Sequence, residues 1–162
     1  MCITVKRLET EEEKKAKAYV HWKAWQETYA GLVEQRYLDT LTLEKCEGLA
    51  LRFEDSALIA RDGQRTVGFI SYGPYRGGEL SHAAEVYAIY ILAEYYGQGV
   101  GYRLMQAALA ELKGYPQIAV WVLRGNERAI RFYVRCGFRF DGREQIITLG
   151  TQKTELRMVL ER

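Results

Sequence analysis

"YYGQGVGYRLM", residues Tyr95–Met105, places three glycines at alternate positions between an apolar aromatic run and a helical pattern. Glycine weakens both strands and helices, so this spacing is typical of a backbone that turns sharply or that a ligand approaches closely. The preceding stretch, 82–96, is long and β-branched and is apolar on both faces, as in a central strand. The following stretch, 100–115, has the pattern of a helix. The exposed N–H groups of such a strand-to-helix turn favour a phosphate-bearing ligand.

The remaining elements are predicted from hydrophobic periodicity and from capping residues. We expect a strand at 2–8, a helix at 10–31 capped by Thr10, shorter helices at 33–53, a hairpin at 55–75 that turns at Asp62-Gly63, a strand at 117–123, a helix at 126–137 capped by Asn126, and two strands within 138–162. This order, β-α-α-β-β-β-α-β-α-β-β, predicts an α+β or mixed α/β sheet with helices on both faces. The length of 162 residues and the apolar content of 48% fit one domain spanning 1–162.

Composition and charge narrow the class of protein. The net charge of +2 is far from the basic excess of a dedicated nucleic-acid binder, so such a partner is not expected. The sequence has no apolar run of membrane-spanning length and no apolar signal segment after Met1, so we expect a cytoplasmic protein with no membrane partner. Cys2, Cys46 and Cys136 are widely spaced and include no CxxC pair, so neither a disulfide framework nor a metal site is indicated.

Two common phosphate-binding loops do not match the glycine turn. A nucleoside triphosphate loop ends in Gly-Lys-Ser/Thr, whereas Gly101 is followed by Tyr102 and Arg103, which supply neither the lysine nor the magnesium-binding hydroxyl. A dinucleotide fingerprint needs a further small residue where Tyr102 stands, and it opens a first βαβ unit. Nucleotide hydrolysis and hydride transfer are therefore both disfavoured.

The turn instead resembles the motif Arg/Gln-x-x-Gly-x-Gly/Ala of the GNAT family of acetyl-CoA-dependent N-acetyltransferases. Gly99 and Gly101 occupy its two small positions, and Tyr96 stands where Arg or Gln is usual. A second stretch, "NERAIRFYVRCGF" at 126–138, is similar to the family's later motif Asn-x-x-Ala-x-x-Phe-Tyr-x-x-x-Gly-Phe. The resemblance implies a mixed, mostly antiparallel sheet of about seven strands over nearly the whole chain. It also implies transfer of an acetyl group from acetyl-CoA to a primary amine by direct attack, with no acyl-enzyme.

The resemblance also implies which residues bind coenzyme A and which one acts as the acid. Tyr133 would protonate the departing thiolate, since a tyrosine with a pKa near ~10 stays protonated at neutral pH. The backbone of Ile89 and Ile91 would hydrogen-bond the pantetheine arm and the thioester carbonyl. The implied cofactor-binding residues are Ile89, Tyr90, Ile91, Tyr96, Gly97, Gln98, Gly99, Val100, Gly101, Tyr102, Asn126, Ala129 and Tyr133.

Candidates for the general base and for the acceptor site come from their positions on the predicted strand and helix. Glu85, at the start of the central strand, is the candidate base, with Glu79 and His82 as weaker candidates. The amine can alternatively lose its proton to water without a dedicated base. Trp25 and Tyr29 lie on one apolar face of the first helix, where they either pack in the core or edge the acceptor pocket.

Three alternatives stay open at this point. A coenzyme A-binding module without catalysis would keep the glycine turn but admit no amine. A module that contacts RNA or protein would use the arginine flank formed by Arg124, Arg128, Arg131 and Arg135. That flank otherwise forms a solvated face or contacts the cofactor's 3′-phosphate. The last strands are also candidates for pairing across a two-fold axis in a homodimer.

Overall fold

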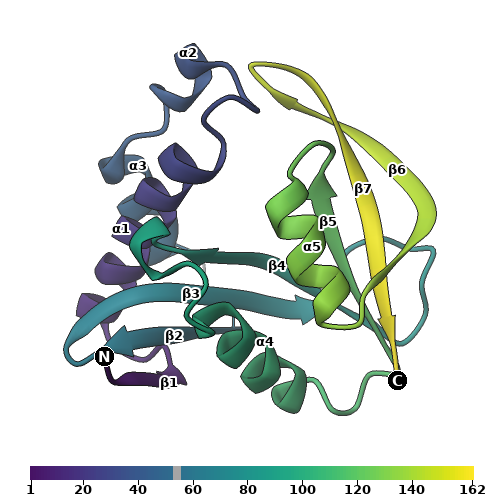
Figure 1. Ribbon diagram of the computed structural model, residues 1–162, viewed down its shortest axis with the longest axis horizontal. Coiled ribbons are helices and arrows are strands. Elements are labelled where there is room, and N and C mark those ends of the chain that lie inside the picture. The colour runs from purple at the N-terminus through teal and green to yellow at the C-terminus, as the bar shows by residue number, and fades with distance from the viewer. Residues whose placement is uncertain (53–55) are drawn as a thin grey trace.

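The computed structural model describes residues 1–52 and 56–162, so two ends of predicted elements, Phe53 and Asp55, lie outside the described residues. The order of elements agrees with the sequence prediction, and Figure 1 shows their arrangement. They are β1 (Ile3–Arg7), α1 (Glu11–Thr28), α2 (Gln35–Leu38), α3 (Leu43–Arg52), β2 (Ser56–Asp62), β3 (Arg65–Pro74), β4 (Ala83–Ile91), the 3₁₀ helix η1 (Ala93–Tyr95), α4 (Val100–Glu111), β5 (Gln117–Leu123), α5 (Glu127–Arg135), β6 (Arg139–Leu149) and β7 (Thr151–Glu161).

The strands form one open sheet in the order β1-β2-β3-β4-β5-β7-β6. The β4–β5 pair is parallel, and the other described pairs are antiparallel. The prediction of a mixed, mostly antiparallel sheet of about seven strands is therefore confirmed. β6 is an edge strand that is exposed along most of its length.

Helices cover both faces of the sheet, as predicted. Lys17 of α1 lies over the Phe69 ring of β3 at 4.8 Å. A Cβ added at the neighbouring Gly68 would point to the opposite face of the sheet, where it would lie 3.3 Å from Leu104 of α4. Successive strand residues face opposite sides, so α1 and α4 lie on opposite faces of β3. The central strands are consequently buried on both sides, and Figure 1 shows α4 and α5 on the same side of the molecule as one another.

β4 and β5 separate part of the way along their length. Their pairing runs from Ala83↔Gln117 to Val86↔Val120 and then stops. β4 continues to Ile91 along β3, while β5 continues to Leu123 along β7. In the described structure the β5-facing edge of β4 therefore has no strand partner after Val86, and backbone groups are left available in the middle of the sheet.

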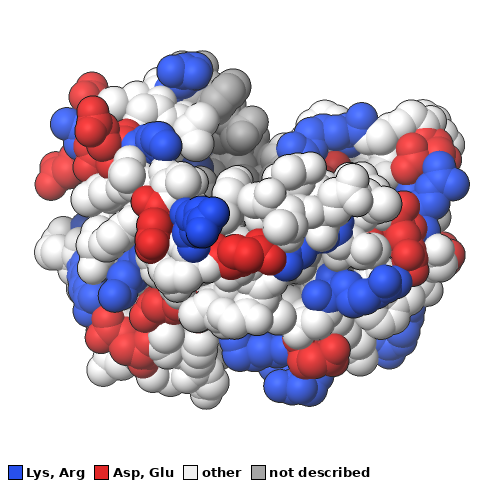
Figure 2. Space-filling view, turned by 90° about the horizontal axis from the view of Figure 1, so that it is seen from above, with Lys and Arg blue, Asp and Glu red and all other residues white. Residues whose placement is uncertain are grey.

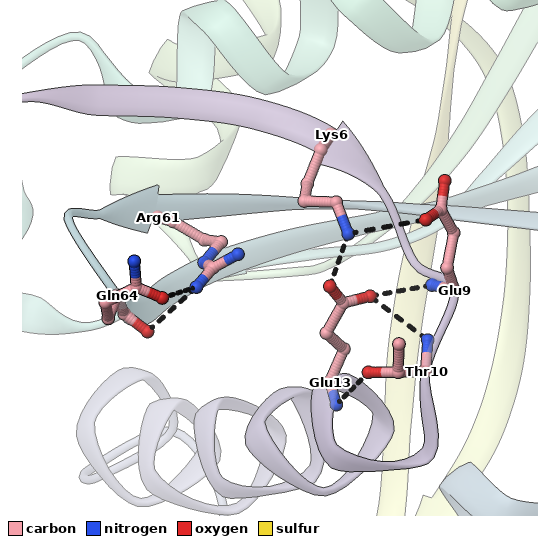
Figure 3. A network of polar contacts seen from close by, with 6 residues as sticks. All are labelled: Lys6, Glu9, Thr10, Glu13, Arg61 and Gln64. Carbon is pink, nitrogen blue, oxygen red and sulfur yellow. Dashed lines mark hydrogen bonds and ion pairs between the residues drawn. The ribbon is translucent and has the colours of Figure 1, made fainter.

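The N-cap predicted at Thr10 is confirmed, and in the structure it is part of a capping box at the start of α1 (Figure 3). The Thr10 hydroxyl accepts the Glu13 N–H at 3.1 Å, and the Glu13 carboxylate accepts the Thr10 N–H at 3.2 Å. Lys6 of β1 also binds this carboxylate, and its hydrogen bond lowers the pKa of Glu13 to about 2. The box gives hydrogen-bond partners to two backbone N–H groups that the helix itself cannot pair.

Three predicted boundaries are corrected by the structure. The central strand ends at Ile91 because Leu92 bonds back to Val67 and the chain turns into η1, so the strand does not run to 96. The hairpin turns at Gly63 and Gln64, one residue later than predicted, because Asp62 still pairs with Arg65. The first helix ends at Thr28, three residues before Gly31.

Candidate active site

A cavity of about 850 Å³ occupies the place where β4 and β5 separate. Its walls come from both strands beyond their last pair, from the turn before α4, from α5, from the end of α1 and from the β6–β7 hairpin. The cavity therefore reaches both faces of the sheet. Every cofactor-binding residue expected from the sequence lines it except Gln98, whose amide donates to the Glu94 carbonyl at 2.9 Å instead. Their individual roles stay predictions.

The three glycines of the turn serve two different physical purposes. Gly97 and Gly99 have φ of 73° and 80°, in the left-handed region that side chains disfavour. Gly101 instead lies where a Cβ would come within 2.9 Å of Ile91 and 3.2 Å of Phe132. The first two glycines shape the turn, and the third lets α4 pack against β4 and α5.

The turn leaves amide groups available at the start of α4. Gly99 is the N-cap residue, and no side chain of residues 1–52 or 56–162 caps the helix. The first hydrogen bond of the helix runs from the Arg103 N–H to the Gly99 carbonyl at 3.1 Å. The amides of Gly99, Val100 and Gly101 have no hydrogen-bond partner within the described residues. Together with the helix dipole, they can bind an anion.

A cation from α5 lies beside this turn. The guanidinium of Arg128 stacks on the Tyr96 ring at 3.6 Å from its centroid, and both residues line the cavity. The Tyr96 hydroxyl also lies 3.3 Å from the Thr28 hydroxyl of α1. Tyr96 stands at the GNAT motif position that usually holds Arg or Gln. In this protein Arg128 of α5 supplies a positive charge next to that position.

Tyr133 presents an unpaired hydroxyl to the cavity. Its side chain is 7% exposed, and its ring packs between Phe132 and Phe138 with centroids at 5.5 and 5.8 Å. No described residue forms a hydrogen bond with the hydroxyl, and burial raises the pKa of Tyr133 above its ordinary value. The hydroxyl therefore stays protonated and available to an acceptor within the cavity.

Asn126 lies at the inner end of α5. Its Oδ1 accepts the Ala129 N–H at 3.4 Å, which confirms the predicted cap, and the residue is buried. Gly137 follows the helix with φ of 102°, as expected of a residue just past a helix end. The cap fixes the start of α5 and thereby the direction in which Tyr133 faces, about two helical turns further on.

Aromatic residues form the wall of the cavity on the α1 side. The Tyr29 and Tyr90 hydroxyls lie 3.1 Å apart, and the Trp25 and Tyr29 rings meet at 4.7 Å. His21 stacks on Tyr90 at 6.1 Å, and burial lowers the pKa of this histidine to about 4. Trp25 and Tyr29 thus both line the cavity and pack in an apolar cluster, so the two readings of these residues are compatible.

Glu85, the carboxylate expected as general base, lies away from the cavity wall. It is 2% exposed, and its oxygens accept the Arg76 N–H at 3.1 Å and the Arg76 guanidinium at 2.8 and 3.4 Å. Glu79 is bound by Tyr75 at 2.5 Å and by Arg157 at 2.7 Å. These contacts satisfy both carboxylates within the fold, and their geometry disfavours a role as base.

Several lining residues have no sequence signal of their own. Trp121 of β5 is one of them, whereas Arg128 belongs to the flank that was expected to be either solvated or in contact with the cofactor. The β6–β7 hairpin contributes Ile147, Leu149 and Glu155. Those three positions could be found only by knowing how far the hairpin reaches over the end of α1.

Comparison with known proteins identifies the family. A model described as the acetyltransferase (GNAT) family matches residues 17–138. The uncharacterized N-acetyltransferase YuaI of Bacillus subtilis is 33% identical over 135 residues, which cover 81% of this chain and 77% of that protein. The chain belongs to the GNAT family, and the resemblance seen in its two motifs is confirmed.

Two solved structures share the fold. The PaiA N-acetyltransferase of Thermoplasma acidophilum, solved in complex with coenzyme A, has a TM-score of 0.79 at 21% identity, with both chains covered completely. YncA of Salmonella typhimurium, solved with its cofactor acetyl-CoA, has a TM-score of 0.74 at 16% identity, over 99% of this chain and 94% of that one.

Two observations bear on other partners. Of the helices in residues 1–52 and 56–162, none combines the length and apolar character needed to cross a bilayer. On the face drawn in Figure 2, Asp and Glu are interspersed among Lys and Arg. This face therefore offers no continuous basic strip, among the described residues, of the kind that a polyanion would follow.

Proposed function

We propose that the protein transfers the acetyl group of acetyl-CoA to a primary amine by direct attack. Membership of the GNAT family makes the chain an acetyl-CoA-dependent N-acetyltransferase, and the geometry of the cavity supports this step. The observation that carries the proposal is the set of amides at Gly99, Val100 and Gly101, which lack partners in the described structure and open into the cavity. They would bind the pyrophosphate, with Arg128 beside them as a counter-charge.

The separated strands support the position of the acyl chain. A pantetheine arm that runs from the glycine turn along Ile91 and Ile89 would pair with the free edge of β4 as a missing strand would. The thioester would then lie near Tyr133. The strands supply orientation here, which is the main requirement for attack of an amine on an activated acyl group.

The proposed step balances as follows. The lone pair of the amine forms a bond to the thioester carbon, the C–S bond breaks, and its electron pair stays on sulfur. Tyr133 gives its hydroxyl proton to that sulfur, and the new amide nitrogen loses one proton to water, which returns a proton to the tyrosinate. The products are an N-acetylated amine and coenzyme A, and no acyl-enzyme forms.

We propose that water accepts the proton of the attacking amine, because the position of Glu85 disfavours its role as a dedicated general base. Its carboxylate is held by Arg76 and lies away from the cavity wall. Deprotonation through water requires only that a water molecule enter the cavity beside the amine, which the cavity volume of about 850 Å³ allows.

The alternative function, a coenzyme A-binding module without catalysis, is separated by one experiment. Thermal unfolding with acetyl-CoA, ATP or NAD, followed by thiol release from acetyl-CoA with a panel of primary amines, tests both halves. Stabilisation by acetyl-CoA alone together with amine-dependent thiol release supports the transferase. Stabilisation with no thiol release from any amine in the panel supports the module.

A further inference from the structure

The charges that line the cavity are segregated between its two ends. Arg128, Arg131 and Arg135 line it from α5, and Arg128 stacks on Tyr96 beside the glycine turn, where the cofactor is expected. Among the described residues that line the cavity the one carboxylate is Glu155 of β7, on the wall shared with Ile147 and Leu149. A ligand that spans the cavity therefore meets cations where the phosphates are expected and an anion at the far end.

The strand register shows which side of the sheet Glu155 faces. Glu155 lies opposite Leu123 of β5 and Gln145 of β6. Opposed residues of paired strands point to the same face, and residues two apart along a strand do so as well. Leu123 packs with Trp25 and Tyr29 of α1. Glu155 therefore faces α1, the side of the sheet away from α4 and α5.

No cation in the described structure neutralises Glu155. Its carboxylate accepts one hydrogen bond, from the Gln145 amide at 2.8 Å, and it takes part in no ion pair between described residues. The cations that flank it on the same face of β7 are already engaged. Lys153 binds Glu34 at 2.9 Å, and Arg157 binds Asp141 at 2.6 Å and Glu79 at 2.7 Å.

The apolar wall around this carboxylate limits what can bind there. Trp25, Tyr29, Ile147 and Leu149 surround this end of the cavity, and these side chains present rings and methyl groups rather than further charges. A ligand with several positive charges would leave all but one of them facing apolar surface, at a large cost in desolvation. A ligand with one ammonium group and an apolar body satisfies both features.

We infer that Glu155 is the acceptor-binding carboxylate, and that the acceptor is a primary amine with a single positive charge and an apolar body. This inference rests on the proposed acetyl transfer for its chemical meaning. The carboxylate attracts the ammonium form from solution, and the aromatic wall holds the apolar body. The bound ammonium loses one proton to water before its lone pair attacks the thioester. An apolar monoamine is favoured over a polyamine, an aminoglycoside or an acidic metabolite.

Binding to the coenzyme A-loaded protein provides a test that does not require turnover. Trp25 and Trp121 line the cavity, so tryptophan fluorescence reports on its occupancy. The probes are 2-phenylethylamine, its neutral isostere 2-phenylethanol, and spermidine. We expect wild-type protein to bind the amine at least ~10-fold more tightly than the alcohol, the order expected for one charged hydrogen-bonded pair, and more tightly than spermidine.

Two variants locate the effect. Glu155→Gln keeps the shape and the bond to Gln145 but removes the charge, so the preference for amine over alcohol should fall to within ~2-fold. Glu161→Gln makes the same change on the same strand at an exposed position bonded to Gln117, and it should retain the wild-type preference. Coenzyme A affinity measured by calorimetry should be equal in all three proteins, which excludes misfolding as the cause.

The outcomes separate this inference from the proposed function. Charge-dependent binding that Glu155→Gln abolishes supports the inference even where no acetylation is seen, and then the transferase proposal fails by itself. Acetylation of 2-phenylethylamine with an unchanged KM in Glu155→Gln overturns the inference and leaves the transferase intact. Equal binding of amine and alcohol by the wild type, or tighter binding of spermidine, also overturns it.

Discussion

Replacing Tyr133 by Phe removes one hydroxyl from the cavity and should separate chemistry from binding. The ring contacts with Phe132 and Phe138 are kept, and no hydrogen bond with a described residue is lost, so the free energy of unfolding should change by less than ~1 kcal/mol. A positioned general acid contributes ~10²–10⁴ in rate, which corresponds to ~2.7–5.4 kcal/mol of activation free energy. The expected result is that loss in rate with coenzyme A affinity unchanged within ~3-fold.

The assay is a single turnover of bound acetyl-CoA with a saturating amine, because product release can mask a slower chemical step. Tyr72→Phe is the matched control, since Tyr72 is also 7% exposed and lies on β3 outside the cavity wall. It should react at the wild-type rate. A Tyr133→Phe protein that reacts within ~3-fold of wild type would refute the assignment of this hydroxyl as the acid.

Three further predictions concern the turn, the buried histidine and the buried carboxylate. Gly99→Ala should lower the free energy of unfolding by ~1–2 kcal/mol, because Gly99 has φ of 80°, and should weaken coenzyme A binding at least ~10-fold by calorimetry. Gly142→Ala is the control, since Gly142 has φ of 89° but does not line the cavity. It should lose a similar amount of stability and keep its affinity for coenzyme A. Burial lowers the pKa of His21 from 6.5 to about 4, so the stability contributed by the neutral imidazole is fully present above pH 6.5 and is lost as the pH falls toward 4. Chemical denaturation should therefore show that the free energy of unfolding decreases by up to ~3 kcal/mol over this interval. In His21→Phe this pH-dependent decrease should be smaller. Glu85→Gln should lower the free energy of unfolding by ~1.5–3 kcal/mol, because its hydrogen bonds to Arg76 become weaker. Turnover per folded molecule should stay within ~2-fold of the wild-type value. A ~100-fold loss of turnover would instead support Glu85 as the general base.

The fold could be predicted well because its determinants are local. The order of elements follows from apolar periodicity and from caps such as Thr10 and Asn126, whose hydrogen bonds lie within three residues of the cap. The exact end of the central strand could not be predicted, because it depends on the backbone hydrogen bond from the Leu92 N–H to the Val67 carbonyl, which joins residues distant along the chain. Local signals carry no information about such partners.

The site divides in the same way. The glycine turn and Tyr133 belong to short contiguous motifs, so their positions on the cavity could be anticipated. The position of Glu155 could not be anticipated, because it depends on the register of three strands. Its lack of a counter-ion among the described residues depends in turn on Lys153 being engaged with Glu34. Glu85 illustrates the converse, since a strand-end carboxylate looks available in sequence until Arg76 is placed beside it.

The account depends most on the amides at the start of α4, and nuclear magnetic resonance of ¹⁵N-labelled protein observes them individually. During titration with coenzyme A, the signals of Gly99, Val100 and Gly101 should move downfield and saturate with the affinity measured by calorimetry, while pantetheine, which has no pyrophosphate, leaves them in place. If at saturation these three signals move no more than that of Gly142, the diphosphate lies elsewhere and the proposed placement of the acyl donor is wrong.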